Sequence, residues 1–155
     1  MGSVRSNVGA AACAAALVVA ACSGSGDPVR AAIDSAVKAA NARDAGALFD
    51  NVAPDFQAGD GSSPAEARAT VERYLAAYEI LDVRIRDVVV ERGEGGARVR
   101  LRAEMSGQPR RIAGLEGLVP SASAYDFDLR LVPVGRVWKI AWAQWNPAAP
   151  GSRNP

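Results

Sequence analysis

The spacing of apolar residues changes once along this chain, near Ile80, and that change limits the folds open to it. Before Ile80 the apolar residues recur every three or four positions, as on one face of an α-helix. After it they alternate with charged residues, as on a half-buried β-strand. Helices followed by strands, each with one apolar face, predict an α+β domain with two packed layers.

The helical part shows two clear starts. Asp27 followed by Pro28 is typical of a helix cap and first helical position, and the apolar spacing continues to about Asn41. Asp44 predicts a second, short helix that carries Val52 and ends at Pro54.

Residues 57–62 are polar and contain glycine, which predicts a loop. Ser63, Pro64 and Glu66 then form the pattern of a capping box with proline at the first helical position. This third helix is expected to end near Glu79.

The second half predicts an antiparallel meander of about four strands, joined by turns at residues 93–96 and 133–136. The link over residues 107–120 has no clear pattern, and residues 147–155 are expected to form a disordered tail. The strands are predicted around four alternating sets of apolar residues: Val83 and Ile85; Val99 to Met105; Tyr125 to Leu131; and Trp138, Ile140 and Trp142.

The N-terminus carries Val19-Ala20-Ala21-Cys22 after an apolar run and a single Arg5. These residues resemble the lipobox of bacterial lipoprotein precursors, in which the cysteine becomes the first mature residue and receives fatty acyl chains such as palmitate. The resemblance implies a signal peptide over 1–21 and a lipidated Cys22 with a flexible tether over 22–26. A plain secretory signal is a weaker alternative, and the run is too short for a transmembrane helix.

Ser23 after the cysteine resembles the sorting pattern for the outer membrane of Gram-negative bacteria, facing the periplasm. A Gram-positive source would instead place the same anchor on the outer leaflet of its single membrane. In both cases the sequence predicts a domain held at the membrane of the cell envelope through Cys22.

The composition excludes several chemistries. The chain has no histidine, and its two cysteines lie in or next to the signal segment, at Cys13 and Cys22. A thiol nucleophile, a disulfide and a histidine-based triad are therefore excluded from the mature domain, and we expect neither a metal nor a cofactor. Arginines alternate with acids and the net charge is near zero, so the chain lacks the basic footprint of nucleic-acid binding.

The element order, the Ser63-Pro64 helix start and the closing Val137-Trp138-Lys139-Ile140 strand resemble the nuclear transport factor 2-like superfamily over residues 27–146. The resemblance implies a curved sheet wrapped around helices to form a cone. The superfamily includes isomerase-like and dehydratase-like enzymes as well as binding modules, so the resemblance implies a site but no reaction. It also implies that two copies can pair through the sheet as a homodimer.

The cone interior would be either an open pocket or a filled core, and the filled core is the commoner outcome. A pocket would hold a small apolar ligand; a filled core would shift the function to a protein partner. The residues expected to line the interior are Val71, Leu75, Tyr78, Leu101, Met105, Phe127, Leu129, Trp138 and Trp142.

An isomerase or dehydratase of this kind would need an acid that points into the cone. Asp87 is the one weak candidate, because it points inward if the strand keeps its alternation beyond Ile85. A bulge at Asp87 would turn it outward and let Val88 and Val90 face the core instead. We favour the bulge, and with it a non-catalytic function.

Overall fold

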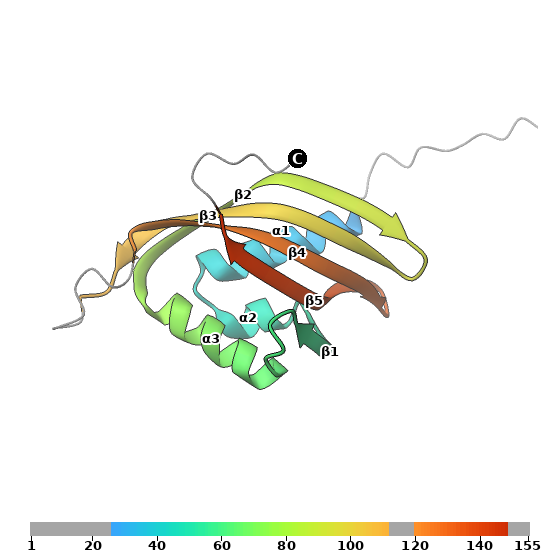
Figure 1. Cartoon of the computed structure of the whole chain (residues 1–155), viewed down its shortest axis with the longest axis horizontal. Coiled ribbons are helices and arrows are strands. Elements are labelled where there is room, and N and C mark those ends of the chain that lie inside the picture. The colour runs from blue at the N-terminus through green and yellow to red at the C-terminus, as the bar shows by residue number, and fades with distance from the viewer. Residues whose placement is uncertain (1–25, 112–119, 149–155) are drawn as a thin grey trace, which may run out of the picture.

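The computed structural model describes residues 26–111 and 120–148, in which one curved antiparallel sheet with a parallel edge strand encloses three helices (Figure 1). Its strand order is β1-β5-β4-β3-β2. The chain is thus an α+β domain, as predicted, with five strands where four were expected. The elements in chain order are α1 (Pro28–Asn41), α2 (Ala45–Phe49), β1 (Val52–Ala58), α3 (Pro64–Ala76), β2 (Tyr78–Gly93), β3 (Gly96–Pro109), β4 (Ala122–Val134) and β5 (Val137–Pro147).

Both predicted helix starts are confirmed. The Asp27 carboxylate accepts a hydrogen bond from the Val29 amide at 3.0 Å, and Pro28 opens α1. At α3 the Ser63 amide donates to Glu66 Oε2 at 2.8 Å while the Glu66 amide donates to Ser63 Oγ at 3.3 Å, which completes the capping box. These bonds satisfy amides that a helix otherwise leaves without partners. α3 ends at Ala76, before the predicted Glu79, because Tyr78 already begins β2.

β1 is the strand that the sequence pattern did not predict. Val52 was assigned to a helix and Gln57 to a loop, but both belong to β1, which runs parallel to β5 at the edge of the sheet. Proline is tolerated in an edge strand, where its missing amide costs no ladder bond, so Pro54 does not break it. Two backbone bonds tie this region to β5, from Ile140 to Asn51 and from Gly59 to Ala143.

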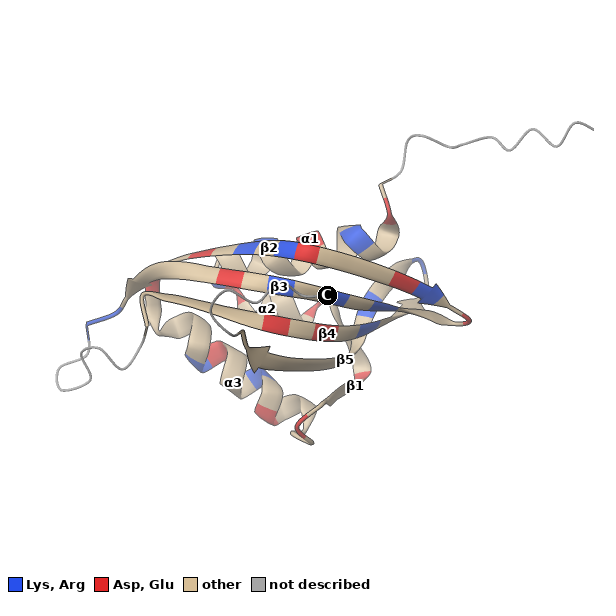
Figure 2. Cartoon of the chain, turned by 45° about the horizontal axis from the view of Figure 1, so that its top comes forward, with Lys and Arg blue, Asp and Glu red and all other residues tan. Residues whose placement is uncertain are grey.

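The two faces of the sheet differ in chemistry. The concave face carries the buried apolar residues that pack against the helices. The convex face carries cross-strand ion pairs, among them Arg86 with Glu104 at 2.7 Å and Arg102 with Asp126 at 2.8 Å. Arg98 pairs with Asp128 in the same way, at 2.9 Å. Figure 2 shows where basic and acidic residues lie along the strands. The alternating arginines of the sequence therefore pair with acids across neighbouring strands on the solvent-exposed face of the sheet.

An irregularity in β5 overturns the prediction that Trp138, Ile140 and Trp142 share one face. Ile140 pairs with Leu131 and Trp142 with Arg130, so the register shifts by one residue between them. Trp142 therefore turns to the convex face, where the Arg130 guanidinium lies 5.0 Å from its ring centroid. A one-residue shift exchanges the two faces of a strand.

The predicted signal peptide, Cys22 and nearly all of the tether lie outside the described residues, as do positions 112–119 and 149–155. β5 reaches Pro147, so the last strand includes the first residue assigned to the tail. Among the described helices, none is both long and apolar enough to cross a bilayer.

Candidate ligand-binding site

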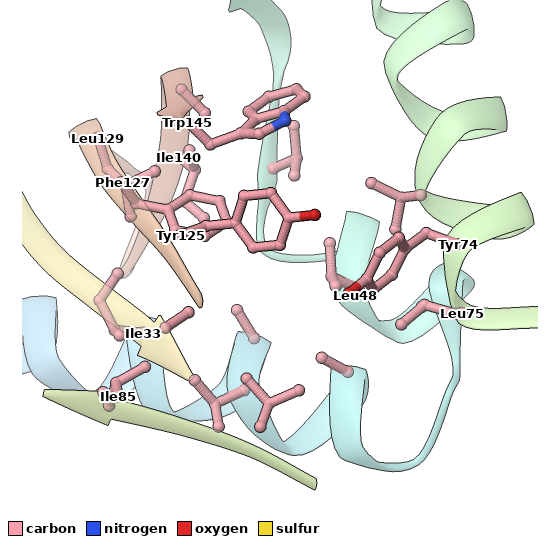
Figure 3. Close-up of a pocket in the computed structure, with 18 of the residues that line it drawn as sticks. Ile33, Leu48, Tyr74, Leu75, Ile85, Tyr125, Phe127, Leu129, Ile140 and Trp145 are labelled. Atoms are coloured by element: carbon pink, nitrogen blue, oxygen red, sulfur yellow. The ribbon is translucent and has the colours of Figure 1, made fainter. Parts of the chain in front are cut away.

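A cavity of about 440 Å³ lies between the helices and the concave face of the sheet (Figure 3). Every helix and every strand contributes side chains to its wall, from Ile33 on α1 to Trp145 on β5. The volume falls within the range of small-molecule pockets. The interior of the cone is therefore partly hollow, and buried residues around the cavity form a packed core.

Six of the nine residues predicted for the interior line this cavity: Val71, Leu75, Leu101, Met105, Phe127 and Leu129. The other three do not. Tyr78 is 1% exposed and belongs to the packed core, and Trp138 is half-buried and packs against that core. Trp142 lies on the convex face because of the register shift in β5.

Sequence reasoning missed Tyr74, Tyr125 and Trp145 as cavity residues. Tyr74 and Tyr125 carried a signal, because Tyr74 follows Val71 by three positions, as on one face of a helix, and Tyr125 begins an alternating apolar set. Trp145 carried none, because it points inward only as a result of the register shift. Its ring centroid lies 6.3 Å from that of Phe127.

Tyrosine hydroxyls supply the polar groups at one end of the cavity. The Tyr74 hydroxyl lies 3.2 Å from Ser123 Oγ and 3.1 Å from Met105 Sδ. The Tyr74 and Tyr125 rings meet edge to face with centroids 6.5 Å apart, and the Tyr125 hydroxyl points into the cavity (Figure 3). Tyr78 lies behind them and donates to the Pro120 carbonyl at 2.9 Å.

The Tyr78 and Tyr125 phenols stay neutral near pH 7. Burial raises the pKa of Tyr78, and the neighbouring Tyr74 raises it further. Burial likewise raises the pKa of Tyr125 above its ordinary value of 10.0. A buried phenol resists ionisation because its charged form loses hydration. Tyr125 can therefore donate or accept hydrogen bonds in the cavity near neutral pH without releasing a proton.

No aspartate, glutamate, lysine or arginine lines the cavity in the described part of the chain. Within those residues there is also no group of three acidic, histidine or cysteine side chains able to hold a metal ion. The arrangement suits the binding of an uncharged molecule that is mostly apolar and carries one polar atom for the tyrosines.

Asp87, the weak catalytic candidate, lies outside the cavity. Its φ of 52° and the register shift between Arg86 and Val89 mark a bulge in β2. Its side chain is exposed. The bulge turns Asp87 away from the cone and lets the half-buried Val88 and Val90 pack against the core.

Solved structures share the fold of this chain, although no protein-family model and no curated protein matches the sequence. A candidate scytalone dehydratase from Novosphingobium aromaticivorans superposes with a TM-score of 0.66 at 12% identity, covering 79% of this chain and 83% of that one. A candidate dehydratase of the nuclear transport factor 2-like family from Streptomyces avermitilis gives 0.64 at 14% identity, covering 79% and 95%.

The chain has the nuclear transport factor 2-like fold, also called cystatin-like. Bd1075 of Bdellovibrio bacteriovorus also matches, with a TM-score of 0.62 at 12% identity, over 77% of this chain but only 40% of that longer one. At such identities the likeness describes the fold and leaves the reaction and the ligand open.

Proposed function

We propose that this domain binds a small, uncharged and largely apolar molecule in its cone and does not transform it. The observation that carries the proposal is the cavity itself, which is walled by apolar side chains and offers tyrosine hydroxyls at one end. Burying apolar ligand surface is favourable by about 25 cal/mol per Å², so such a wall supplies the affinity. The hydroxyls would select ligands with one well-placed oxygen or nitrogen atom.

The alternative is a small-molecule isomerase or dehydratase, which the names of two structural neighbours favour. Such chemistry needs a base or acid with a pKa near the working pH, at hydrogen-bond distance from the substrate. In the described residues the cavity wall has no carboxylate, and the pKa of its Tyr125 phenol is shifted upward, away from neutrality. Non-catalytic binding therefore fits the site better than proton transfer.

We further propose that the domain acts at the cell envelope, anchored through an acylated Cys22, on the basis of the lipobox resemblance. A Cys22→Ala variant should leave the membrane fraction for the soluble one, while wild-type protein stays with the membrane. Mass analysis of the N-terminal peptide would detect the acyl chains directly. A Cys22→Ala protein that remained in the membrane would refute the anchor.

Blocking the cavity tests the binding proposal. Val71→Trp places a large ring in the cavity wall, and Val89→Trp is the matched control on the exposed edge of β2. Both would be made in a chain beginning at Gly26, which keeps the helices and strands that the structure describes. We expect an uncharged naphthalene probe to quench tryptophan emission in wild type and Val89→Trp, but not in Val71→Trp. Equal binding by both variants would refute the site.

A further inference from the structure

Three segments meet at one end of the sheet, which we call the turn end (Figure 1). They are the β2–β3 turn at residues 93–96, the β4–β5 turn at residues 134–137, and the start of α1. Ala97 pairs with Leu131, which places the two turns side by side. Asp27 at the start of α1 forms an ion pair with Arg92, just before the first turn.

The β4–β5 turn exposes apolar side chains that no described residue covers. Val134 and Val137 pair directly across the hairpin and are 36% and 54% exposed. Next to them Trp138 pairs with Pro133 and is half-buried. Single exposed apolar residues are ordinary, but an adjacent pair beside a tryptophan on a turn is typical of side chains that enter the boundary between lipid headgroups and chains.

The charges near this turn favour an anionic surface. Arg136 lies in the turn and Lys139 follows it on β5. Neither has an ion-pair partner among residues 26–111 and 120–148. Glu94 in the neighbouring turn opposes them, and so does Asp50, which lies just before β1 next to the start of β5. Asp27 is already paired with Arg92. Basic residues near anionic lipid headgroups are attracted to them.

The length of the predicted tether places this end near the membrane. Residues 23–26 separate Cys22 from Asp27, and a stretch of that length spans at most about 18 Å when fully extended. An acyl chain on Cys22 therefore keeps the start of α1, and with it the turn end, next to the bilayer. This step rests on the anchor proposed above.

We propose that the turn end docks on the bilayer surface, with Val134 and Val137 in the headgroup–chain boundary and Arg136 and Lys139 against anionic headgroups. The orientation has a consequence for the ligand. Tyr125 lies back along β4 by about 30 Å of strand, so the hydroxyl end of the cavity faces away from the bilayer.

The test uses the full acylated chain in vesicles of phosphatidylethanolamine and phosphatidylglycerol. An environment-sensitive fluorophore is attached to a single introduced cysteine, Val137→Cys, with Ile80→Cys as the matched control. Ile80 is 61% exposed and lies at the opposite end of β2. We expect lipids brominated along their chains to quench the label at position 137 and to leave the label at position 80 unquenched. Equal quenching at both positions, or none at either, would overturn the docking.

Two further measurements separate this proposal from the anchor. If the protein fails to float with the vesicles, the anchor and the docking both fail. If it floats and the label at position 137 remains in water, the docking fails and the anchor stands.

With a long glycine-serine insertion after Gly26, the label at position 137 should still be quenched, and Val134→Ser with Arg136→Ser should abolish that quenching. If the cysteine at position 137 were protected from labelling in cells but not in vesicles, a protein partner would cover it, and the membrane assignment would be overturned.

Discussion

Removing the Tyr125 hydroxyl should weaken binding only for ligands that carry a polar atom at the right place. Tyr125→Phe deletes one neutral hydrogen-bonding group that points into the cavity and keeps the ring that packs against Tyr74. A neutral hydrogen bond contributes about 0.5–1.5 kcal/mol, which corresponds to roughly a 2- to 13-fold loss of affinity. A ligand without the polar atom should bind the variant as well as it binds wild type.

The assay compares two probes of matched shape, acetylnaphthalene with its ketone oxygen and isopropylnaphthalene without it. Binding is followed by quenching of Trp145, which lines the cavity, whereas Trp138 and Trp142 lie outside it. Tyr78→Phe is the matched control, because the Tyr78 hydroxyl is bonded to the Pro120 carbonyl and does not line the cavity. If Tyr125→Phe weakened the binding of both probes equally, or weakened the binding of neither, the assigned role of the hydroxyl would be refuted.

Two further predictions concern stability. Ser63→Ala removes the capping box of α3 and should lower the free energy of unfolding by about 1 kcal/mol in a urea titration, and an unchanged midpoint would contradict the role of the cap. Arg98 lowers the pKa of Asp128 below its ordinary value of 3.8, so the pair stabilises the fold above that value and its contribution is lost as the pH falls further. Asp128→Asn should therefore flatten the loss of stability on acidification below about pH 4 relative to wild type, and parallel acid titrations of the two proteins would contradict the pairing.

Local signals made the helices and most of the sheet predictable. Caps such as Asp27 and Ser63 act within one turn of chain, and the alternation through β3 reports directly which residues face the core. β1 could not be found in this way, because its seven residues alternate irregularly and contain Pro54. Only the parallel neighbour β5, far along the chain, makes that segment a strand.

The site was predictable where it depends on one element at a time. The apolar face of α3 and the alternation of β3 and β4 pointed to Val71, Leu101 and Phe127, which line the cavity. The register shift in β5 arises from pairing with β4, and it moves Trp142 out and Trp145 in. Whether the cone is hollow or filled depends on how all eight elements close around it, which no single pattern in the sequence records.

Native mass spectrometry of the chain from Gly26, purified gently from its expression host, tests the central claim most directly. We predict that wild type carries or accepts one uncharged small molecule per chain, and that Val71→Trp, with its cavity obstructed, carries none. A wild-type protein that retained no molecule and took up none of the naphthalene probes would contradict it. The cavity would then be a packing feature of the fold, and the function would lie with a protein partner.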